Sequence, residues 1–253
     1  MISCLTVTQE NRLPSLARAV ADFAGQTERD RELVIVHNGG AAFHDGVLEI
    51  ARRHDAAPIR VVIAPPGRTL GTLRNLAIDA ARGTYVCQWD DDDRYHPRRL
   101  EVQLDALRSA NCDASFLCDQ LHLFAAAREM YWDDWSDMPY PLNFVPGTLF
   151  ARRESLARYA DERRGEDTTL AVAMLRQGRS FARVREQGYL YVYVFDGANT
   201  FDQAHHAALS LYRRFRGARL IRLEATMRRH VSEYDPPLGP FVMPYDGGKL
   251  DFA

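Results

Sequence analysis

The sequence lacks any long hydrophobic run and has almost no lysine. No apolar stretch in its 253 residues approaches the roughly 20 residues that cross a bilayer, and no basic segment followed by a long apolar stretch stands at its start. We therefore expect a soluble, cytoplasmic protein. Lys249 is the only lysine, and the formal net charge of -2 gives no bulk attraction to nucleic acid. No nucleic-acid partner is expected.

The sequence also lacks closely spaced cysteine pairs, which excludes the common zinc motifs. The four cysteines lie mostly inside apolar runs and are expected to be reduced core residues. The length suits one large α/β domain, or a domain with an appendage, and no internal repeat or low-complexity linker interrupts it.

The first part of the chain alternates apolar strands with amphipathic helices. Expected strands lie at 2–8, 32–40, 59–64 and 84–89, and expected helices at 13–25, 43–54 and 69–83. We expect Gly83 to end the third helix in a left-handed cap. This alternation predicts an α/β fold with parallel strands and right-handed crossovers. The strand ends should then converge on one edge, which would carry Thr8 and Gln9, His37 and Asn38, residues 65–68 and residues 90–93.

Beyond residue 93 the pattern is less regular. We expect a helix at 96–110 with Pro97 in its first turn, a helix at 166–176, and a largely helical stretch at 203–231 before an extended tail. Further strands are expected near 114–118, 121–124, 145–151, 180–184 and 189–195, with residues 130–144 as loop.

Four consecutive aspartates, residues 90–93, follow the strand of the "TYVCQW" segment. Neighbouring unit charges about 5 Å apart repel by roughly 3 kcal/mol at an effective dielectric near 20, so a positive partner is expected. A solvated acidic turn is the alternative. A calcium loop is excluded because Tyr95 stands where that loop requires glycine, and Pro97 begins a helix.

The order of these features resembles the GT-A-fold glycosyltransferases of the family 2 type, over about residues 2–200. The resemblance is carried by residues 5–23, 70–103, 147–156 and 163–175. It implies a Rossmann-like, mostly parallel central sheet flanked by helices, with a C-terminal helical extension. It further implies a GT-A domain at 1–200, split into a nucleotide-sugar half (1–93) and an acceptor half (94–200), followed by helices and an extended tail at 201–253.

The resemblance implies a divalent cation that bridges the donor diphosphate and stabilises the leaving group. Asp92 is the expected direct ligand, and Asp90 is expected nearer the ribose or donor sugar. Asp91 and Asp93 also remain candidates, because the run of four leaves the register open. Hard oxygen ligands suit Mn²⁺ or Mg²⁺, and manganese is favoured by the family.

Donor binding is expected at the converging strand ends. Arg74 could reach phosphate oxygens or the donor sugar, with a surface arginine as the alternative. Thr8, Gln9, Arg68 and Asp91 are further donor-site candidates. Where the family has a base-reading aspartate this chain has Asn38, whose amide could pair with a uracil edge, so a UDP-sugar is expected.

Glu166 and Asp167 open a predicted helix. Helix capping is one interpretation. By resemblance, Asp167 is instead the base that deprotonates the acceptor hydroxyl in an inverting transfer, with Glu166 in support.

Residues after the central motifs give weaker signals. His205 or its neighbour His206 could complete the metal sphere, although an exposed pair is an equal alternative. Trp132, Asp134 and Trp135 combine aromatic faces with carboxylate in the manner of sugar-binding loops, or simply staple loops to the core. The C-terminal helices are basic and could contact an anionic membrane, although a solvated face is the simpler account; the arginines are Arg213, Arg214, Arg216, Arg219, Arg222, Arg228 and Arg229.

These observations predict metal-dependent transfer of a sugar from a UDP-sugar to a hydroxyl of a saccharide or lipid-linked acceptor, with inversion. A nucleotidyltransferase is an alternative, but the sequence has no glycine-rich triphosphate loop. A non-catalytic nucleotide-sugar-binding protein of the same fold is another, suggested by the missing base-reading aspartate.

Overall fold

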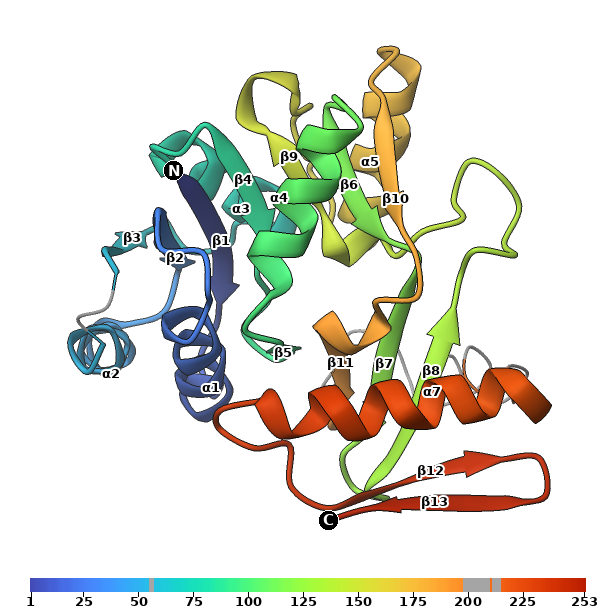
Figure 1. Cartoon of the computed structure of the whole chain (residues 1–253). Helices are drawn as coiled ribbons and strands as arrows, with labels where there is room; N and C mark the ends of the chain where they lie inside the picture. Colours follow the sequence, from blue (N-terminus) through green and yellow to red (C-terminus); the bar gives the residue numbers. More distant parts are fainter. Residues whose placement is uncertain (55–56, 198–209, 211–214) are drawn as a thin grey trace.

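Seven strands form the larger of two sheets in this computed structural model, which describes residues 1–54, 57–197, 210 and 215–253 (Figure 1). The strand order is β10-β6-β9-β4-β1-β2-β3. Only β9 runs antiparallel to its neighbours, so the predicted mostly parallel sheet is confirmed. The strands are β1 (Ile2–Thr8), β2 (Arg31–His37), β3 (Ile59–Ile63), β4 (Tyr85–Gln88), β6 (Ala114–Leu117), β9 (Phe150–Arg152) and β10 (Phe181–Val184).

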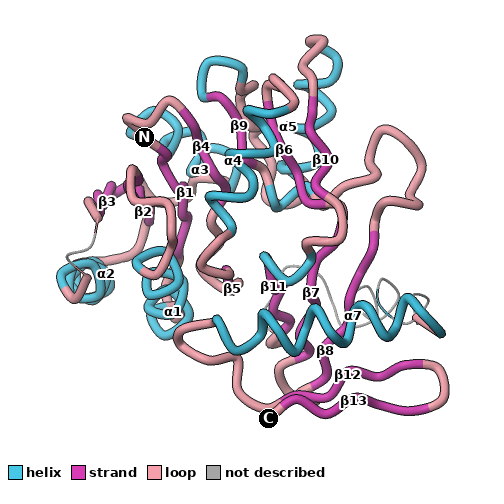
Figure 2. Tube along the Cα trace, viewed as in Figure 1, coloured by secondary structure: helices cyan, strands magenta, loops and turns pink. Residues whose placement is uncertain are grey.

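Helices cover both faces of this sheet (Figures 1 and 2). They are α1 (Leu13–Ala24), α2 (Ala41–Arg52), α3 (Leu70–Ala80), α4 (Arg99–Ser109) and α5 (Glu166–Arg176). Strand β2 shows why two layers form: Leu33 and Ile35 join the apolar cluster under α1, α2 and α4, while Val34 and Val36 join the cluster under α3 and α5. Successive side chains of a strand point to opposite faces, so a continuously apolar strand needs cover on both.

A second, six-stranded sheet has the order β13-β12-β8-β7-β11-β5. Its strands are β5 (Arg94–Tyr95), β7 (Asp119–Phe124), β8 (Glu129–Asp134), β11 (Tyr191–Phe195), β12 (Phe241–Tyr245) and β13 (Gly248–Phe252). Helix α7 (Gly217–His230) runs across this sheet in Figure 1 and buries Leu223 and Met227 in the same cluster as Phe241 and Phe252. The C-terminal tail is thus a hairpin that extends a sheet of the main body.

Several local expectations were wrong. Of the strand expected near 145–151, residues Pro146–Thr148 form a 3-10 turn and β9 begins at Phe150. Residues 129–134 form strand β8 rather than loop, because they pair with β7 from Asp119 opposite Asp134 to Phe124 opposite Glu129, a partner that the segment's own composition does not reveal. Helix α3 ends at Ala80, and Gly83 has no left-handed conformation. Gly83 instead allows close packing, since a Cβ there would lie 2.7 Å from the Ser3 nitrogen.

Helix α4 begins at Arg99, so Pro97 lies in the segment before the helix and not in its first turn. Of the C-terminal stretch expected to be helical, residues 203–209 and 211–214 lie outside the described residues. Within the described part of the chain, no helix has the length and apolar character needed to span a bilayer.

Gly71 joins α3 to the segment that precedes α5. Its N–H donates a hydrogen bond to the Glu162 carbonyl at 3.0 Å, and a Cβ at this position would lie 1.8 Å from the Ala160 carbonyl oxygen. Any side chain would therefore force these two segments apart.

We predict that Gly71→Ala lowers the free energy of unfolding by about 1–3 kcal/mol, because the added methyl group overlaps backbone. The matched control is Gly25→Ala at the end of α1, where the nearest atom to a Cβ is 3.6 Å away and φ is -76°. The control should change stability by less than about 1 kcal/mol. Urea unfolding of both variants measures the difference, and equal stabilities would contradict the close packing described for Gly71.

Candidate active site

A cavity of about 680 Å³ opens at the carboxyl ends of β1, β2 and β4. The predicted convergence of strand ends is observed, since Thr8, Gln9, Asn38, Arg68 and the four aspartates all line it. The opposite wall comes from the first turn of α5 and from the segment before β9. Its polar lining also includes Arg12, Arg74, Gln88, Glu166, Asp167 and Tyr191.

The position of the acidic run follows from strand pairing. Strand β4 lies parallel to β1 with Gln88 opposite Leu5, so the chain leaves β4 beside the end of β1. Trp89 is fully buried, and its backbone N–H donates a hydrogen bond to the Leu5 carbonyl at 3.0 Å. The Thr6 hydroxyl donates to the Trp89 carbonyl at 2.7 Å. The residue before the aspartates is thereby fixed to the sheet.

Arg74 connects the acidic run to α5. Its Nη2 lies 2.8 Å from Asp90 Oδ1, and its Nε donates to Glu166 Oε1, also at 2.8 Å. The side chain is 7% exposed, and burial opposes its charge, but Asp90, Tyr159 and Glu166 raise the pKa of Arg74 well above its usual value. The interpretation as a surface arginine is therefore wrong.

Asp90 is held on both oxygens. Besides the Arg74 contact, its Oδ2 accepts a hydrogen bond from Gln88 Nε2 at 2.9 Å. The Tyr95 hydroxyl donates to its backbone carbonyl, also at 2.9 Å. Asp90 is therefore fixed in one orientation in the cavity.

Arg12 was not identified from the sequence. It lies just before α1, and its Nη1 is 3.0 Å from Asp91 Oδ1 and 2.5 Å from Asp92 Oδ2. Burial and the charge of Asp92 raise the pKa of Asp91 to about 7, although Arg12 opposes the shift. The signal for Arg12 was its position in the short segment between β1 and α1, which follows a strand end expected to face the ligand.

Asp93 faces the second sheet. It accepts a hydrogen bond from the Tyr191 hydroxyl at 2.5 Å and from the Val194 N–H at 3.0 Å, and it is 1% exposed. Burial and the charges of Asp92 and Asp90 raise its pKa. Its contacts link the acidic run to β11.

The remaining carboxylates fit a divalent cation. Asp92 has a 20% exposed side chain and Asp91 only 3%, which makes Asp92 the more accessible of the two. Thr8 Oγ1 and Asp91 Oδ2 are buried and make no hydrogen bond of good geometry among the described residues, although Thr8 is close enough to Asp91 to oppose the rise of its pKa. These atoms therefore retain capacity for a polar ligand. Carboxylate oxygens are the donors that Mg²⁺ and Mn²⁺ prefer.

Asp167 lies in the first turn of α5, as predicted, after Gly165 with φ of 75°. Its Oδ1 accepts a hydrogen bond from the Thr168 N–H at 2.6 Å, so it also stabilises the helix start. Burial, then the charge of Glu166, raise the pKa of Asp167 to about 6, and Arg74 opposes the shift. A carboxylate with such a pKa can accept a proton near neutral pH.

The structure separates the predicted acceptor residues. Trp135 lines the cavity. Trp132 is 3% exposed and packs against Gly188, where a Cβ would lie 2.9 Å from its ring. Asp134 accepts a hydrogen bond from the Ser136 N–H at 2.9 Å and pairs with Arg219. Neither Trp132 nor Asp134 is among the cavity-lining residues, and His205 and His206 lie outside the described residues.

Several C-terminal arginines make ion pairs within the chain. Arg216 pairs with Asp246, and Arg228 pairs with Glu224 at 2.8 Å. Arg222 and Arg229 are exposed on α7, whereas Arg213 and Arg214 lie outside the described residues. The positive face expected from the sequence is therefore partly neutralised.

Comparison with known proteins gives matches in sequence. The family model described as glycosyl transferase family 2 matches residues 5–142, which is more than half of the chain. A cholesterol galactosyltransferase of Borreliella burgdorferi is 27% identical over an alignment of 173 residues, which covers 58% of this chain and 47% of that protein. A chondroitin synthase of Escherichia coli is 33% identical over 104 residues, 41% of this chain and 14% of that protein. The chain thus spans about half the length of the first relative and a small part of the second.

Solved structures match over most of the chain. S. aureus TarS 1-349 in complex with UDP-GlcNAc has a TM-score of 0.62 at 14% identity, covering 92% of this chain and 66% of that one. The mannosyltransferase PcManGT from Pyrobaculum calidifontis, in complex with GDP-Man and Mn²⁺, has a TM-score of 0.61 at 15% identity, covering 93% and 67%. These structures show the fold, and the family match completes the assignment: the chain belongs to glycosyl transferase family 2 and has the GT-A fold.

Proposed function

We propose that this chain transfers a sugar from a UDP-sugar to a hydroxyl of a saccharide or lipid-linked acceptor, with inversion and with the help of Mn²⁺ or Mg²⁺. One observation carries the proposal: Asp92, the third aspartate of the acidic run, and Asp167, with its pKa raised to about 6, line the same cavity. The named relatives and the nucleotide-sugar complexes of TarS and PcManGT support it.

In the proposed donor site, Asp92 and Asp90 would hold the cation, with Asp92 as the direct ligand. A bound cation would neutralise charge that develops on the leaving diphosphate. Arg74 orients Asp90 through its 2.8 Å ion pair, and Arg68 lines the cavity where it can meet phosphate oxygens. Thr8, Gln9, Asn38 and Asp91 line the side where a ribose and a uracil edge can be bound.

Residues on the opposite wall would bind and activate the acceptor. Asp167 accepts the proton of the acceptor hydroxyl, and the oxygen then attacks the anomeric carbon from the face opposite the leaving diphosphate. Glu166 supports this role by holding Arg74, which places the base helix against the acidic run. Trp135 is the aromatic residue of this set positioned to contact a sugar.

The same arrangement supports a division of labour along the chain. Residues 1–93 would supply most of the donor site, and residues 94–200 would supply the base and Trp135. The described part of the region after residue 200 includes α7 and the β12–β13 hairpin. Arg222 and Arg229 are exposed on α7. An anionic membrane surface could contact the protein at these two arginines.

We predict that Asp92→Ala weakens manganese-dependent UDP binding by at least about tenfold, because the diphosphate loses the charge that bridges it to the protein. Isothermal titration of UDP with and without Mn²⁺ measures this. The matched control is Asp105→Ala, which removes an exposed carboxylate on α4 and should leave binding unchanged. Full manganese-dependent affinity in Asp92→Ala would show that Asp92 is not the ligand.

We predict that Asp167→Asn retains UDP and metal affinity while the transfer rate falls by about 10²- to 10⁴-fold, because the base acts only on the acceptor. Asparagine caps a helix nearly as well as aspartate, so a purely structural Asp167 would leave both stability and turnover almost unchanged. Product analysis of the same reactions distinguishes sugar transfer from nucleotide attachment, and donor turnover distinguishes both from a protein that only binds the nucleotide-sugar.

The pKa of Asp167 also predicts the pH profile. Below pH 6 its carboxyl is protonated and cannot accept a proton, so kcat/KM for the acceptor should fall about tenfold per pH unit below 6 and level off above it. UDP affinity measured at the same pH values separates changes at the donor site, where the pKa of Asp91 is about 7. An unchanged inflection in the residual activity of Asp167→Asn would assign the titration to another group.

A further inference from the structure

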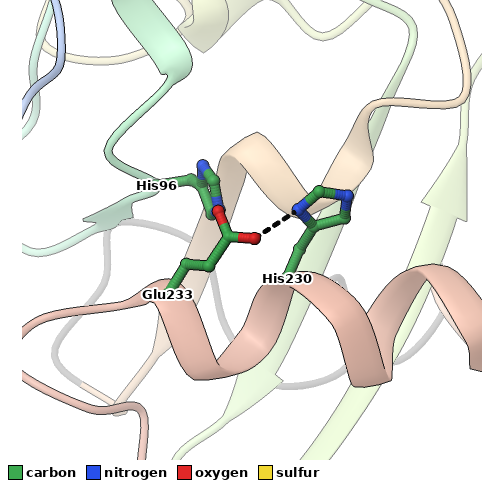
Figure 3. Close-up of side chains that lie close together, drawn as sticks. All are labelled: His96, His230 and Glu233. Atoms are coloured by element: carbon green, nitrogen blue, oxygen red, sulfur yellow. Dashed lines mark hydrogen bonds and ion pairs between the residues drawn. The ribbon is translucent and has the colours of Figure 1, made fainter.

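A cluster of two histidines and one glutamate lies outside the cavity (Figure 3). His96 comes from the segment between β5 and α4, His230 ends α7, and Glu233 belongs to the 3-10 turn η4 (Val231–Glu233). Glu233 Oε2 lies 3.1 Å from His96 Nε2, and Glu233 Oε1 lies 3.1 Å from His230 Nδ1. One ligand atom from each residue lies within 4.8 Å of the others.

Packing holds the two imidazoles in place. His96 is 0% exposed and His230 is 9% exposed. The ring of Tyr189 stacks on His230 at 3.9 Å between centroids and meets His96 edge-on at 5.0 Å. The Tyr234 hydroxyl donates to the Tyr189 carbonyl at 2.7 Å, which fixes this aromatic wall to the C-terminal segment.

A polar atom points into the cluster without satisfying its hydrogen-bonding capacity. His96 Nε2 is buried, and although it lies 3.1 Å from Glu233 it makes no hydrogen bond of acceptable geometry with the described residues. Buried polar atoms in this state usually have a water or an ion as partner. The side chains around it offer two imidazole nitrogens and one carboxylate.

We propose that His96, His230 and Glu233 form a second metal site, for a borderline divalent cation such as Zn²⁺, that fastens the end of α7 to the segment after the acidic run. Zinc binds imidazole nitrogen at about 2.0–2.1 Å and carboxylate oxygen at about 2.0–2.2 Å, often with three protein ligands and a water. Tetrahedral bonds of that length separate ligand atoms by about 3.3 Å. Each imidazole nitrogen already lies 3.1 Å from one of the two Glu233 oxygens, and one ligand atom from each residue lies within 4.8 Å of the others.

The ligand chemistry separates this site from the cavity. Two of its three donors are imidazoles, which suit Zn²⁺, whereas the cavity offers carboxylates, which suit Mg²⁺ and Mn²⁺. None of the three residues lines the cavity. The proposal is therefore independent of the proposed transferase activity.

Two features limit the affinity. The backbone N–H of Arg98 donates a hydrogen bond to His96 Nδ1 at 3.2 Å. This hydrogen bond is lost when His96 Nε2 binds a metal, because Nδ1 must then carry the proton. The charges of Arg98 and Arg229 also oppose a cation, although Glu101 pairs with Arg98 at 3.2 Å. We therefore expect micromolar rather than nanomolar binding.

The test is zinc titration of the chelator-treated 253-residue chain at pH 7.5 against a fluorescent competitor. Wild-type protein should bind Zn²⁺ with micromolar affinity, and Co²⁺ should give the visible absorption of a tetrahedral site. His230→Gln and Glu233→Gln should each weaken Zn²⁺ binding at least tenfold and abolish the cobalt spectrum. Zinc should also raise the Tm of the wild type and not that of the variants.

Two controls assign the binding to this cluster. His44→Gln disrupts another close histidine pair, in which His37 Nε2 and His44 Nδ1 are 3.0 Å apart. Asp92→Asn alters the cavity. Both should retain wild-type zinc affinity. Absence of micromolar binding in the wild type, or loss in a control with retention in Glu233→Gln, overturns the proposal. Circular dichroism checks that each variant is folded. If His230→Gln does not fold, Glu233→Gln tests the zinc site alone, because its side chain is 39% exposed and its replacement should not disturb the core.

Discussion

The paired contacts of Arg74 with Asp90 and Glu166 are the interaction on which the site depends. A guanidinium that is 7% exposed would be costly to bury alone, and it is stable here because two carboxylates meet it at 2.8 Å. The same contacts join α3, the acidic run and α5, which are far apart in sequence. Loss of the arginine would leave two carboxylates close together without their shared partner, and the two walls of the cavity would repel each other.

A second buried ion pair, between Arg94 and Asp22, supports the acidic run. Arg94, the residue after the run, donates from Nε and Nη2 to the two oxygens of Asp22 at 2.8 and 2.9 Å. Arg94 also donates a hydrogen bond to the Pro236 carbonyl. Arg12 forms ion pairs with Asp91 and Asp92. Arg12, just before α1, thus holds two of the aspartates, and Arg94, just after the run, is fixed by Asp22 and by the Pro236 carbonyl of the C-terminal segment. The C-terminal segment is thereby joined to the residue that follows the acidic run.

Much of the fold could be predicted because its signals are local. The alternation of apolar strands and amphipathic helices gave the parallel sheet, and the order of motifs gave the family. Strand β8 could not be predicted, since its residues become a strand only by pairing with β7, and the C-terminal hairpin depends on a distant partner in the same way. Gly83 was recognised as special for the wrong reason: it serves a close approach to Ser3.

The sequence by itself determined that the aspartates and Asn38 follow strand ends, that Arg74 lies in a helix and that Glu166 and Asp167 open one. Strand polarity and the period of two are local properties, so these positions follow from the chain alone. Only the tertiary structure decided the surroundings of each carboxylate. In the folded chain Asp93 accepts a hydrogen bond from Tyr191, and the buried Asp91 pairs with Arg12. Burial also raises the pKa of Asp167. Desolvation and charge pairing depend on neighbours brought from elsewhere in the chain, and no single stretch of sequence contains them.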